Sequence, residues 1–507
     1  MAEGSGPAPA PDLTRGVPLA SIPEDGVFAG RVGDDAVLLV RLDDGVHAVA
    51  AHCTHYGAPL AEGRIADGRV HCPWHHACFD LRSGSAACAP AMAPLDRWKV
   101  DLRGNTVFVG ERLPAVAPPP PPRSGRPDLP RRVLIVGGGA AGYAAARRLR
   151  TRGFDGAITM LSADADAPVD RPNLSKDFLA GTAPPEWLPL QSPDDYVAQG
   201  IDLRLDCEVA SVDPRGRHVA TRGGERFDYD ALVLATGAQP RRLSLPGFDL
   251  PHVFALRTLA DARAIVAAAA QARDVAFVGA GFIGLEAAAA LRQRGLGVSV
   301  VAPEALPMGR LLGGQLGEML VALHRAHGVA FHLGRRPLRV DGKALVLDDG
   351  SRVAADLVIV GAGVVPRTRL AEAAGLAVDN GILVDATLQA SIPGHYAAGD
   401  VARYPHAGVR TRVEHWVHAQ RQGECVADNL LGDARTFTDV PFFWTHQYEL
   451  ELRVTGHLSN WDELRIEGTP DAHDFVARYY HWGRPVAAAT AGRDRANLEI
   501  EAQLAAA

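Results

Sequence analysis

The sequence of 507 residues is poor in cysteine and in aromatic residues, and it has no excess of positive charge. Six cysteines are too few for a disulfide-stabilised scaffold in a chain of this length. A net charge of −7 gives no basis for nucleic-acid binding. No run reaches the roughly 18 consecutive apolar residues that a membrane-spanning helix needs. We therefore expect neither a nucleic-acid partner nor a membrane span.

What is present fits a multidomain globular protein. Hydrophobic residues make up 47% of the chain, and its length predicts about three or four domains. Residues 1–14 are rich in Gly, Ala and Pro and lack the basic-then-apolar pattern of a signal peptide. We expect a disordered tail there and a cytoplasmic location. Five consecutive prolines, Pro118–Pro122, predict a semi-rigid linker over 113–130.

Short β-strands separated by turns fill residues 15–112. Ala36–Leu42 and Gly45–Val49 flank a Asp-Asp turn, which predicts a hairpin. Val100–Leu102 and Thr106–Val109 flank Arg-Gly-Asn, which predicts another. This part of the chain is expected to be a small all-β domain.

Two cysteines and two histidines inside this domain have the spacing of metal ligands. Cys53 and His55 are followed, after sixteen residues, by Cys72 and His75. Zinc is one reading, because sites with two Cys and two His are common. Here, however, each loop supplies one Cys and one His. That division suits a two-iron cluster in which both cysteines hold one iron and both histidines hold the other.

A strand, a glycine-rich turn and a helix follow the linker. Val133–Val136 reads as a buried parallel strand, and Gly137, Gly139 and Gly142 have the G-x-G-x-x-G spacing. Those glycines allow a tight turn, a close approach to a pyrophosphate and helix packing. A turn without ligand is the alternative. Asp164 lies 22 residues after Gly142, where an acidic residue can bind a ribose hydroxyl.

The same pattern returns about 140 residues later. Val275–Val278 leads into Gly279, Gly281 and Gly284, and Glu304 lies 20 residues after the last glycine. Two fingerprints in one chain predict two bound dinucleotides. Further strands end in small or acidic residues, and the candidate positions there are Ala235, Thr236, Gly237, Gly363, Gly399 and Asp400.

The motifs together resemble known families. The loops around Cys53 and Cys72 resemble the Rieske [2Fe–2S] family, in its soluble ferredoxin type, because Ala58 and Trp74 stand where respiratory Rieske domains carry extra cysteines. Asp170–Lys176 and Arg412–Trp416, among other stretches, resemble two-dinucleotide flavoproteins of glutathione reductase type. The closer resemblance is to NADH-dependent ferredoxin reductases and to apoptosis-inducing-factor-3-like proteins.

The resemblance implies a fold of several domains. It predicts an all-β Rieske domain over 15–112, α/β FAD-binding residues 131–251 and 378–436, an α/β NAD-binding domain over 252–377, and a small α/β C-terminal domain over 437–507. FAD would bind the first fingerprint and NAD(H) the second. The cofactor-binding residues it implies are Gly137, Gly139, Ala141, Gly142, Asp164, Arg171, Lys176, Ala235, Thr236, Gly237, Gly279, Gly281, Ile283, Gly284, Glu286, Glu304, Gly363, Gly399, Asp400, Glu414, His415 and Trp416.

Lys176 and Glu286 are the predicted catalytic pair. In the family the matching residues form an ion pair near the flavin and the nicotinamide, where a cation stabilises negative charge on the reduced ring. A glutamate favoured by the helix dipole is the alternative for Glu286. A carboxylate at Glu304 favours NADH over NADPH, although Arg310 could accommodate a 2′-phosphate.

The remaining cysteines predict no further redox chemistry. No C-x-x-x-x-C follows the first fingerprint, so disulfide reductase activity is not expected. Cys207 and Cys425 are expected to be buried apolar residues, as are Cys78 and Cys88. His76, next to a ligand position, is expected to be exposed.

The expected function is electron transfer from NADH through FAD to a [2Fe–2S] centre, either the fused Rieske cluster or a separate ferredoxin. The acceptor would be a ferredoxin, an oxygenase or a P450, and the protein would be a monomer or a homodimer. Two alternatives stay open: an NADH oxidase or quinone reductase, and a redox-sensing interaction protein.

Overall fold

The computed structural model describes residues 10–24, 26–114 and 129–506. The chain forms two compact units, residues 1–118 with 493–507, and residues 119–492. The proline run at 118–122 lies outside the described residues. No helix in the described ranges is both long and apolar enough to cross a membrane.

A six-stranded antiparallel sheet forms one layer of the first unit, with strand order β1-β10-β9-β4-β3-β2. Its strands are β1 (Val17–Pro18), β2 (Val27–Val32), β3 (Asp35–Leu42), β4 (Gly45–Ala50), β9 (Arg97–Arg103) and β10 (Thr106–Arg112). Both predicted hairpins are present, as β3–β4 and β9–β10. The domain begins before residue 15, since Asp12 caps a short 3-10 helix in which Leu13 is fully buried.

A second, four-stranded sheet carries the two Cys/His loops. Its strands are β5 (Arg64–Ala66), β6 (Arg69–His71), β7 (Cys78–Asp80) and β8 (Ala86–Cys88), in sequential order. One loop lies between β4 and β5, and the other joins β6 to β7. Cys53 and Cys72 belong to a buried cluster with Leu60, Val70 and Phe79, so apolar packing fixes both loops.

The C-terminal helix α11 (Asp494–Ala506) belongs to the first unit, although it ends the chain. It lies beside β5 of the cluster-loop sheet. Asn497, Leu498 and Ile500 are its buried residues. The fold of the first unit is therefore completed by residues that lie almost 400 positions after its last β-strand.

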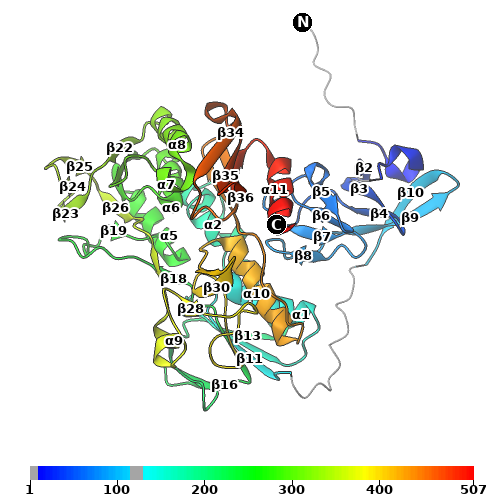
Figure 1. Cartoon of the computed structure of the whole chain (residues 1–507), viewed down its shortest axis with the longest axis horizontal. Coiled ribbons are helices and arrows are strands. Elements are labelled where there is room, and N and C mark those ends of the chain that lie inside the picture. Colours follow the sequence, from blue (N-terminus) through cyan, green and yellow to red (C-terminus); the bar gives the residue numbers. More distant parts are fainter. Residues whose placement is uncertain (1–9, 25, 115–128, 507) are drawn as a thin grey trace, which may run out of the picture. The chain divides into compact units, whose positions relative to one another are not determined.

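The two glycine fingerprints each follow the central strand of a five-stranded parallel sheet; β11 of the first sheet and β26 of the second are labelled in Figure 1. The first sheet has the order β13-β12-β11-β17-β29, with β11 (Arg132–Val136), β12 (Ala157–Leu161), β13 (Ile201–Arg204), β17 (Ala231–Leu234) and β29 (His395–Ala397). The second has the order β19-β26-β20-β21-β22, with β19 (Val253–Phe254), β20 (Asp274–Val278), β21 (Gly297–Ala302), β22 (Ala330–Leu333) and β26 (Leu357–Val360).

A five-stranded antiparallel sheet follows near the end of the second unit, in the order β32-β33-β36-β35-β34. Its strands are β32 (Phe442–Gln447), β33 (Leu450–Gly456), β34 (Glu463–Thr469), β35 (Asp474–His481) and β36 (Arg484–Ala491). It shares one hydrophobic core with the second parallel sheet. Tyr479 and Trp461 also donate hydrogen bonds to the carbonyls of Leu312 and Leu311.

The second unit contains ten α-helices within the described residues. They are α1 (Ala140–Thr151), α2 (Arg171–Leu174), α3 (Asp177–Ala180), α4 (Pro193–Ala198), α5 (Leu259–Ala269), α6 (Phe282–Gln293), α7 (Gly309–Leu312), α8 (Gly314–Ala326), α9 (Arg369–Ala373) and α10 (Trp416–Leu430). The smaller sheets are β14 (Val209–Asp213) with β15 (His218–Thr221) and β16 (Arg226–Asp228); β23 (Pro337–Asp341) with β24 (Ala344–Leu347) and β25 (Arg352–Ala354); β28 (Ile382–Leu383) with β30 (Ala402–His406) and β31 (Val409–Thr411); and β18 (Ala238–Pro240) with β27 (Val364–Pro366).

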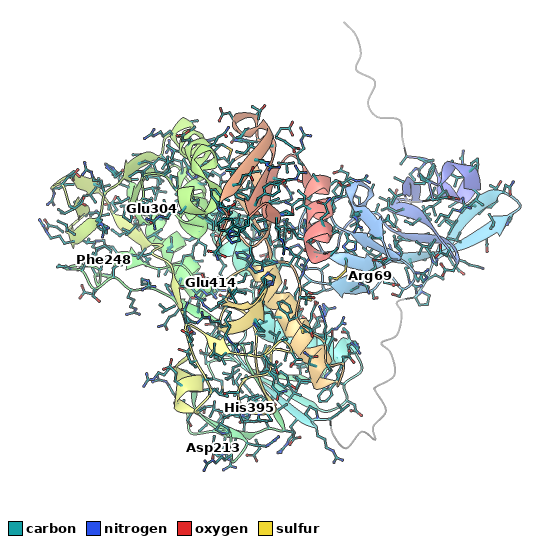
Figure 2. The ribbon with its side chains drawn as sticks, in the orientation of Figure 1. Arg69, Asp213, Phe248, Glu304, His395 and Glu414 are labelled. Carbon is teal, nitrogen blue, oxygen red and sulfur yellow. A yellow bond between two sulfur atoms is a disulfide. The ribbon has the colours of Figure 1, made fainter. Side chains whose placement is uncertain are left out.

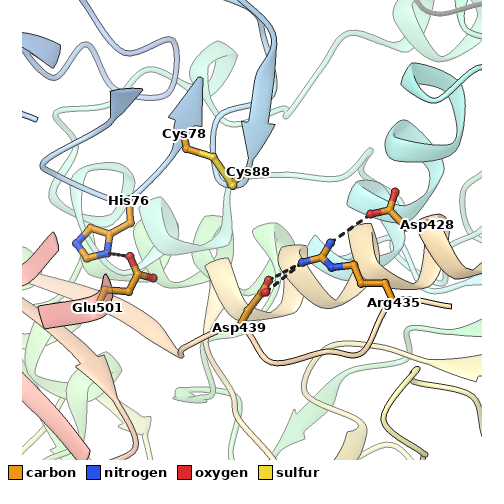
Figure 3. Close-up of a disulfide and its surroundings, with 7 residues drawn as sticks. All are labelled: His76, Cys78, Cys88, Asp428, Arg435, Asp439 and Glu501. Carbon is orange, nitrogen blue, oxygen red and sulfur yellow. Dashed lines mark hydrogen bonds and ion pairs between the residues drawn. A yellow bond between two sulfur atoms is a disulfide. The ribbon is translucent and has the colours of Figure 1, made fainter. Parts of the chain in front are cut away.

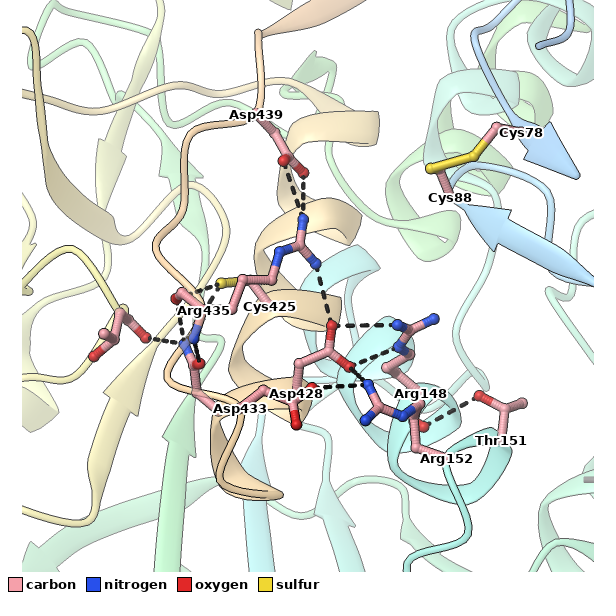
Figure 4. A network of polar contacts seen from close by, with 12 residues as sticks. Cys78, Cys88, Arg148, Thr151, Arg152, Cys425, Asp428, Asp433, Arg435 and Asp439 are labelled. Carbon is pink, nitrogen blue, oxygen red and sulfur yellow. Dashed lines mark hydrogen bonds and ion pairs between the residues drawn. A yellow bond between two sulfur atoms is a disulfide. The ribbon is translucent and has the colours of Figure 1, made fainter. Parts of the chain in front are cut away.

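Helices α1 and α10 pack closely although they lie almost 300 residues apart in the sequence. A Cβ on Gly423 of α10 would lie only 2.2 Å from the carbonyl oxygen of Ala141 in α1. The end of this helix pair is held by Asp428, whose buried carboxylate pairs with Arg148, Arg152 and Arg435 at 2.8, 2.8 and 3.2 Å (Figure 4). A glycine contact and a shared carboxylate thus join the first glycine turn to α10.

We expect Gly423→Ala to destabilise the second unit by about 1–3 kcal/mol, because the new methyl group would collide with the backbone of Ala141, which cannot move away as a flexible side chain can. The measurement is thermal unfolding followed by release of FAD fluorescence. Gly314→Ala is the matched control, since a Cβ there meets nothing within 4 Å. Unfolding of the Gly423 variant at the wild-type temperature would contradict the close helix contact.

Candidate functional site

The two Cys/His loops of the first unit have the same backbone design. The amide of Cys53 donates to the carbonyl of Ala58 and that of Cys72 to Ala77, at 2.9 and 2.7 Å. Four residues after each cysteine the backbone is left-handed, with φ of 76° at Gly57 and 61° at His76. In each loop the amide of that residue donates to the cysteine carbonyl. Because the two loops have the same backbone hydrogen bonds, they can hold their cysteine and histidine side chains around one common point.

The side chains of the four candidate ligands contact each other in two pairs, one of cysteines and one of histidines. The side chains of Cys53 and Cys72 are hydrogen-bonded, which together with burial raises the pKa of the Cys53 thiol. The Nδ1 atoms of His55 and His75 lie 3.2 Å apart, and burial lowers the pKa of His55 to about 4. No three such side chains in the described ranges surround a point where one metal ion could bind. A cysteine pair and a histidine pair fit a two-iron cluster, in which each iron takes one pair.

The expectation that His76 is exposed is wrong. Its side chain is buried, and its Nδ1 lies 2.7 Å from Oε2 of Glu501 on α11 (Figure 3). The backbone at His76 is left-handed, and its ring contacts that helix. Sequence reasoning missed this contact because its two residues are 425 positions apart.

Cys78 and Cys88 are joined by a disulfide, which the sequence analysis did not expect (Figure 3). They are paired residues of the antiparallel strands β7 and β8, and their Cα atoms lie 4.9 Å apart. Strands of only three residues give too weak a pattern for their register to be read from sequence. The disulfide closes the sheet directly after the second ligand loop. Cys207 and Cys425 are free and buried, as expected.

The first glycine turn has the close contacts that its spacing predicts. Gly137 has φ of 123°, and a Cβ there would lie 2.1 Å from the carbonyl oxygen of Ala235. A Cβ on Gly142 would lie 2.1 Å from the carbonyl oxygen of Gly137. Gly139 caps the N-terminus of α1 without any side-chain hydrogen bond to the helix. The first-turn amides of α1 are therefore available to an anionic group.

Charged side chains from three separate stretches of the chain surround this turn. Arg171 lies near Gly139 and pairs with Asp164 at 3.0 Å. Burial and the neighbouring Arg257 lower the pKa of Arg171 to about 10. Arg257 pairs with Asp400 at 2.7 Å. Arg257 was not predicted, and nothing in its local sequence marks it, because only the fold brings it to the end of the first sheet.

The second glycine turn repeats the first. Gly279 has φ of 107°, and a Cβ there would lie 2.4 Å from the carbonyl oxygen of Gly361. Gly281 caps α6, and a Cβ on it would meet nothing within 4 Å. Ile283, in the first turn of α6, is 47% exposed.

Lys176 and Glu286 come together across the two halves of the second unit. Lys176 Nζ lies 3.0 Å from Glu286 Oε2, with 11% and 5% of the side chains exposed. Ser175 donates to the same carboxylate oxygen at 2.6 Å, and Lys176 also donates to the carbonyl of Pro172. Ser175 was not predicted, although its place beside Lys176 was a signal. Trp444 of β32 has its ring centroid 5.7 Å from Lys176 Nζ.

The Glu-His-Trp stretch lies at the start of α10. Glu414, labelled in Figure 2, forms an ion pair with Arg412, with 2.6 Å between its carboxylate and the guanidinium. Arg412 also donates a hydrogen bond to the carbonyl of Asp400. The His415 ring packs against Phe443, with centroids 4.3 Å apart, and Phe443 contacts Phe282 of α6. Burial lowers the pKa of His415 to about 4. These contacts bring the start of α10 next to the second glycine turn.

Glu304, labelled in Figure 2, is exposed. It lines a hollow of about 540 Å³ beyond the end of β21. Arg310 and Arg336 line the same hollow. A volume in this range is typical of a small-ligand site. Glu304 does not contact the Lys176–Glu286 pair. This separation is expected, because the adenosine end of a dinucleotide lies far from its nicotinamide end.

Paired glycine turns on two parallel sheets, joined to a domain with paired Cys and His loops, define a Rieske-fused flavoprotein of the two-dinucleotide type. Comparison with known proteins agrees. Residues 131–423 match the pyridine nucleotide-disulphide oxidoreductase family, 17–99 the Rieske [2Fe–2S] domain and 442–506 the reductase C-terminal domain. The chain belongs to the pyridine nucleotide-disulphide oxidoreductase family, and its cofactors are FAD, NAD(H) and a [2Fe–2S] cluster rather than zinc.

Similar proteins cover most of the chain. Human apoptosis-inducing factor 3 is 34% identical over 92% of this chain and 79% of its own length. The ferredoxin–NAD(+) reductase component of a Burkholderia cepacia anthranilate 1,2-dioxygenase system is 38% identical over 71% of this chain and 91% of its own. A solved putidaredoxin reductase–putidaredoxin complex has a TM-score of 0.71 at 32% identity, covering 74% and 93% of the two chains. The protein is an NAD(P)H-dependent FAD oxidoreductase.

Glu304→Ser is expected to shift the coenzyme preference toward NADPH, because it removes the carboxylate that is expected to repel a 2′-phosphate while Arg310 and Arg336 stay. We expect the ratio of kcat/KM for NADH to kcat/KM for NADPH to fall about tenfold or more. Glu318→Ser, on the exposed side of α8, is the control and should keep the ratio. An unchanged ratio in the Glu304 variant would place the adenosine ribose elsewhere.

Proposed function

We propose that the protein takes a hydride from NADH at the site beside Lys176 and Glu286 and passes single electrons to its own Rieske cluster, from which a further protein takes them. The observation that carries this proposal is the occurrence, in one chain, of two dinucleotide turns and a Cys-pair, His-pair site. When bound, FAD accepts two electrons together and releases them one at a time, which NADH cannot do.

The residues around the first turn would hold FAD. The N-terminus of α1 and Arg171 would offer positive charge to the pyrophosphate. Asp164 would accept a hydrogen bond from a ribose hydroxyl. Asp400 is held in place by its ion pair with Arg257. The glycine turn before α6 offers the same kind of site to NAD(H). Cys53 and Cys72 would hold one iron, and His55 and His75 the other.

Lys176 would place positive charge where negative charge accumulates as the hydride arrives. Glu286 holds that ammonium in position, and Ser175 fixes the carboxylate by donating to the shared oxygen. Both charged groups are almost completely buried, so their field is weakly screened. The pair is thus positioned before substrate binds and needs little rearrangement during transfer.

The external acceptor is proposed to be a small iron–sulfur protein, an oxygenase or a P450. The support is the class of relatives: one is the reductase component of a dioxygenase system, and a similar solved structure is a complex with putidaredoxin. Direct transfer to O₂ or a quinone is the competing function, and it needs no Rieske cluster.

Cys72→Ser tests the role of the cluster. Loss of one thiolate ligand should remove the [2Fe–2S] absorbance and abolish NADH-driven reduction of a one-electron protein acceptor such as cytochrome c, while NADH still bleaches the flavin. Cys207→Ser is the control, because that cysteine lies in the second unit and should leave both properties unchanged. Full cytochrome c reduction without the cluster would favour direct transfer from the flavin.

Lys176→Met keeps the length of the side chain and removes its charge. We expect flavin bleaching by NADH, followed by stopped-flow absorbance, to slow at least about tenfold, because one buried cation no longer stabilises the developing negative charge. Lys176→Arg should restore part of the rate, and Lys343→Met, at an exposed lysine, should leave it unchanged. A wild-type bleaching rate in the Met variant would remove Lys176 from the mechanism.

A further inference from the structure

Four histidines form a cluster in the second unit that the mechanism above does not use as a group. They are His406 at the end of β30, His415 just before α10, His418 in the first turn of α10, and His457 after β33. We refer to them as the four-histidine cluster. The rings of His406 and His457 lie with centroids 4.0 Å apart at 33°. His418 interacts electrostatically with all three other rings.

Several ring nitrogens of the cluster are buried without a partner. Among the described residues these are Nδ1 of His415, Nδ1 of His418 and Nε2 of His457. Buried polar atoms in proteins are nearly always hydrogen-bonded, to protein or to ordered water. The side chain of His418 is completely buried, with Tyr404, Phe437 and Gln422 around it. Adjacent imidazoles with free nitrogens can accept a proton on one side and donate on the other.

Aromatic contacts link one end of the four-histidine cluster to the helix that carries Glu286. His415 packs on Phe443, which contacts Phe282 at the start of α6, the helix that carries Glu286. Asp400 acts electrostatically on His415. The other end is His406, a partly exposed residue of the β30–β31 hairpin.

The electrostatics keep the interior rings neutral. Burial lowers the pKa of His415 and of His457 to about 4, holds the pKa of His418 well below its usual value, and also lowers the pKa of His406. Arg421, on the same helix, disfavours a positive charge on the His418 ring. Asp400, by contrast, favours a positive charge on the His415 ring. A proton that passes along the buried histidine rings would therefore not stay bound to any of them.

The chemistry requires such a passage. NADH gives up a hydride, which is one proton and two electrons, whereas one-electron carriers take electrons only. One proton must therefore leave the buried site for every NADH oxidised. We propose that the four-histidine cluster is the route by which this proton reaches solvent, from His415 through His418 and His457 to His406. The proposal rests on the proposed function only in requiring one-electron acceptors.

Ferricyanide as acceptor tests the route, because it takes single electrons whether or not the Rieske cluster does. Two ferricyanide ions and one NADH give two ferrocyanide ions, NAD⁺ and one proton, and an indicator dye in weak buffer follows that proton. We expect His457→Ala and His406→Gln to slow proton release at least about tenfold, with NADH bleaching of the flavin unchanged. Added imidazole should restore the rate in His457→Ala.

His327→Ala is the matched control, because His327 is also a partly exposed ring stacked on an aromatic neighbour, Tyr448, at 3.7 Å. Proton release at the wild-type rate in both cluster variants would overturn the route, even if electrons reach the Rieske cluster as proposed. Slowed release in the cluster variants would support the route, and a Rieske cluster that stays oxidised when the wild-type protein is mixed with NADH without ferricyanide would contradict only the proposed acceptor.

A second measurement needs no turnover. In protein labelled with ¹⁵N-histidine, replacing His406 by Gln should shift the ring-nitrogen NMR signals of His457 and, through His457 and His418, those of His415, since connected rings share their hydrogen-bonding state. His327→Ala should leave both signals in place. Unchanged His415 signals in the His406 variant would show that the rings are not connected, which would also overturn the route.

Discussion

The buried ion pair between Lys176 and Glu286 is the contact on which the arrangement of the candidate site depends. It joins a turn after the first glycine fingerprint to the helix of the second. A charge removed from water is tolerated only when it is paired and its remaining hydrogen-bonding atoms are satisfied. Ser175 and the carbonyl of Pro172 complete that requirement, so the two dinucleotide sites are held in register by polar contacts at the point where they meet.

The same principle recurs elsewhere in the second unit. Arg257 and Asp400 join the start of the second half to the last strand of the first sheet, and Asp428 ties α1 to the end of α10 through three arginines. The close contact between Ala141 and Gly423 then leaves no space between the helices. Charges paired across distant parts of the sequence fix the scaffold, and the glycine turns leave backbone amides available to phosphate.

Local patterns were sufficient to predict the fold class, because strand, glycine turn and helix are encoded within about 30 residues. They also predicted the hairpins of the first unit, whose turns lie within a few residues of their strands. They failed where a contact spans the chain. His76 was expected at the surface, yet it bonds to Glu501, and no short-range signal links them. Cys78 and Cys88 bond because two three-residue strands set their register, and Arg257 reaches Asp400 only through the folded sheet.

Electrons from NADH are proposed to enter this chain at the flavin and to reach its own Rieske cluster. Rapid mixing with one equivalent of NADH, freeze-quenching and EPR spectroscopy test this transfer directly, because a [2Fe–2S] cluster is paramagnetic only when reduced by one electron. The Rieske signal is expected to rise within a single turnover, after the flavin absorbance is bleached. A flavin that bleaches fully while the Rieske signal never develops would contradict it.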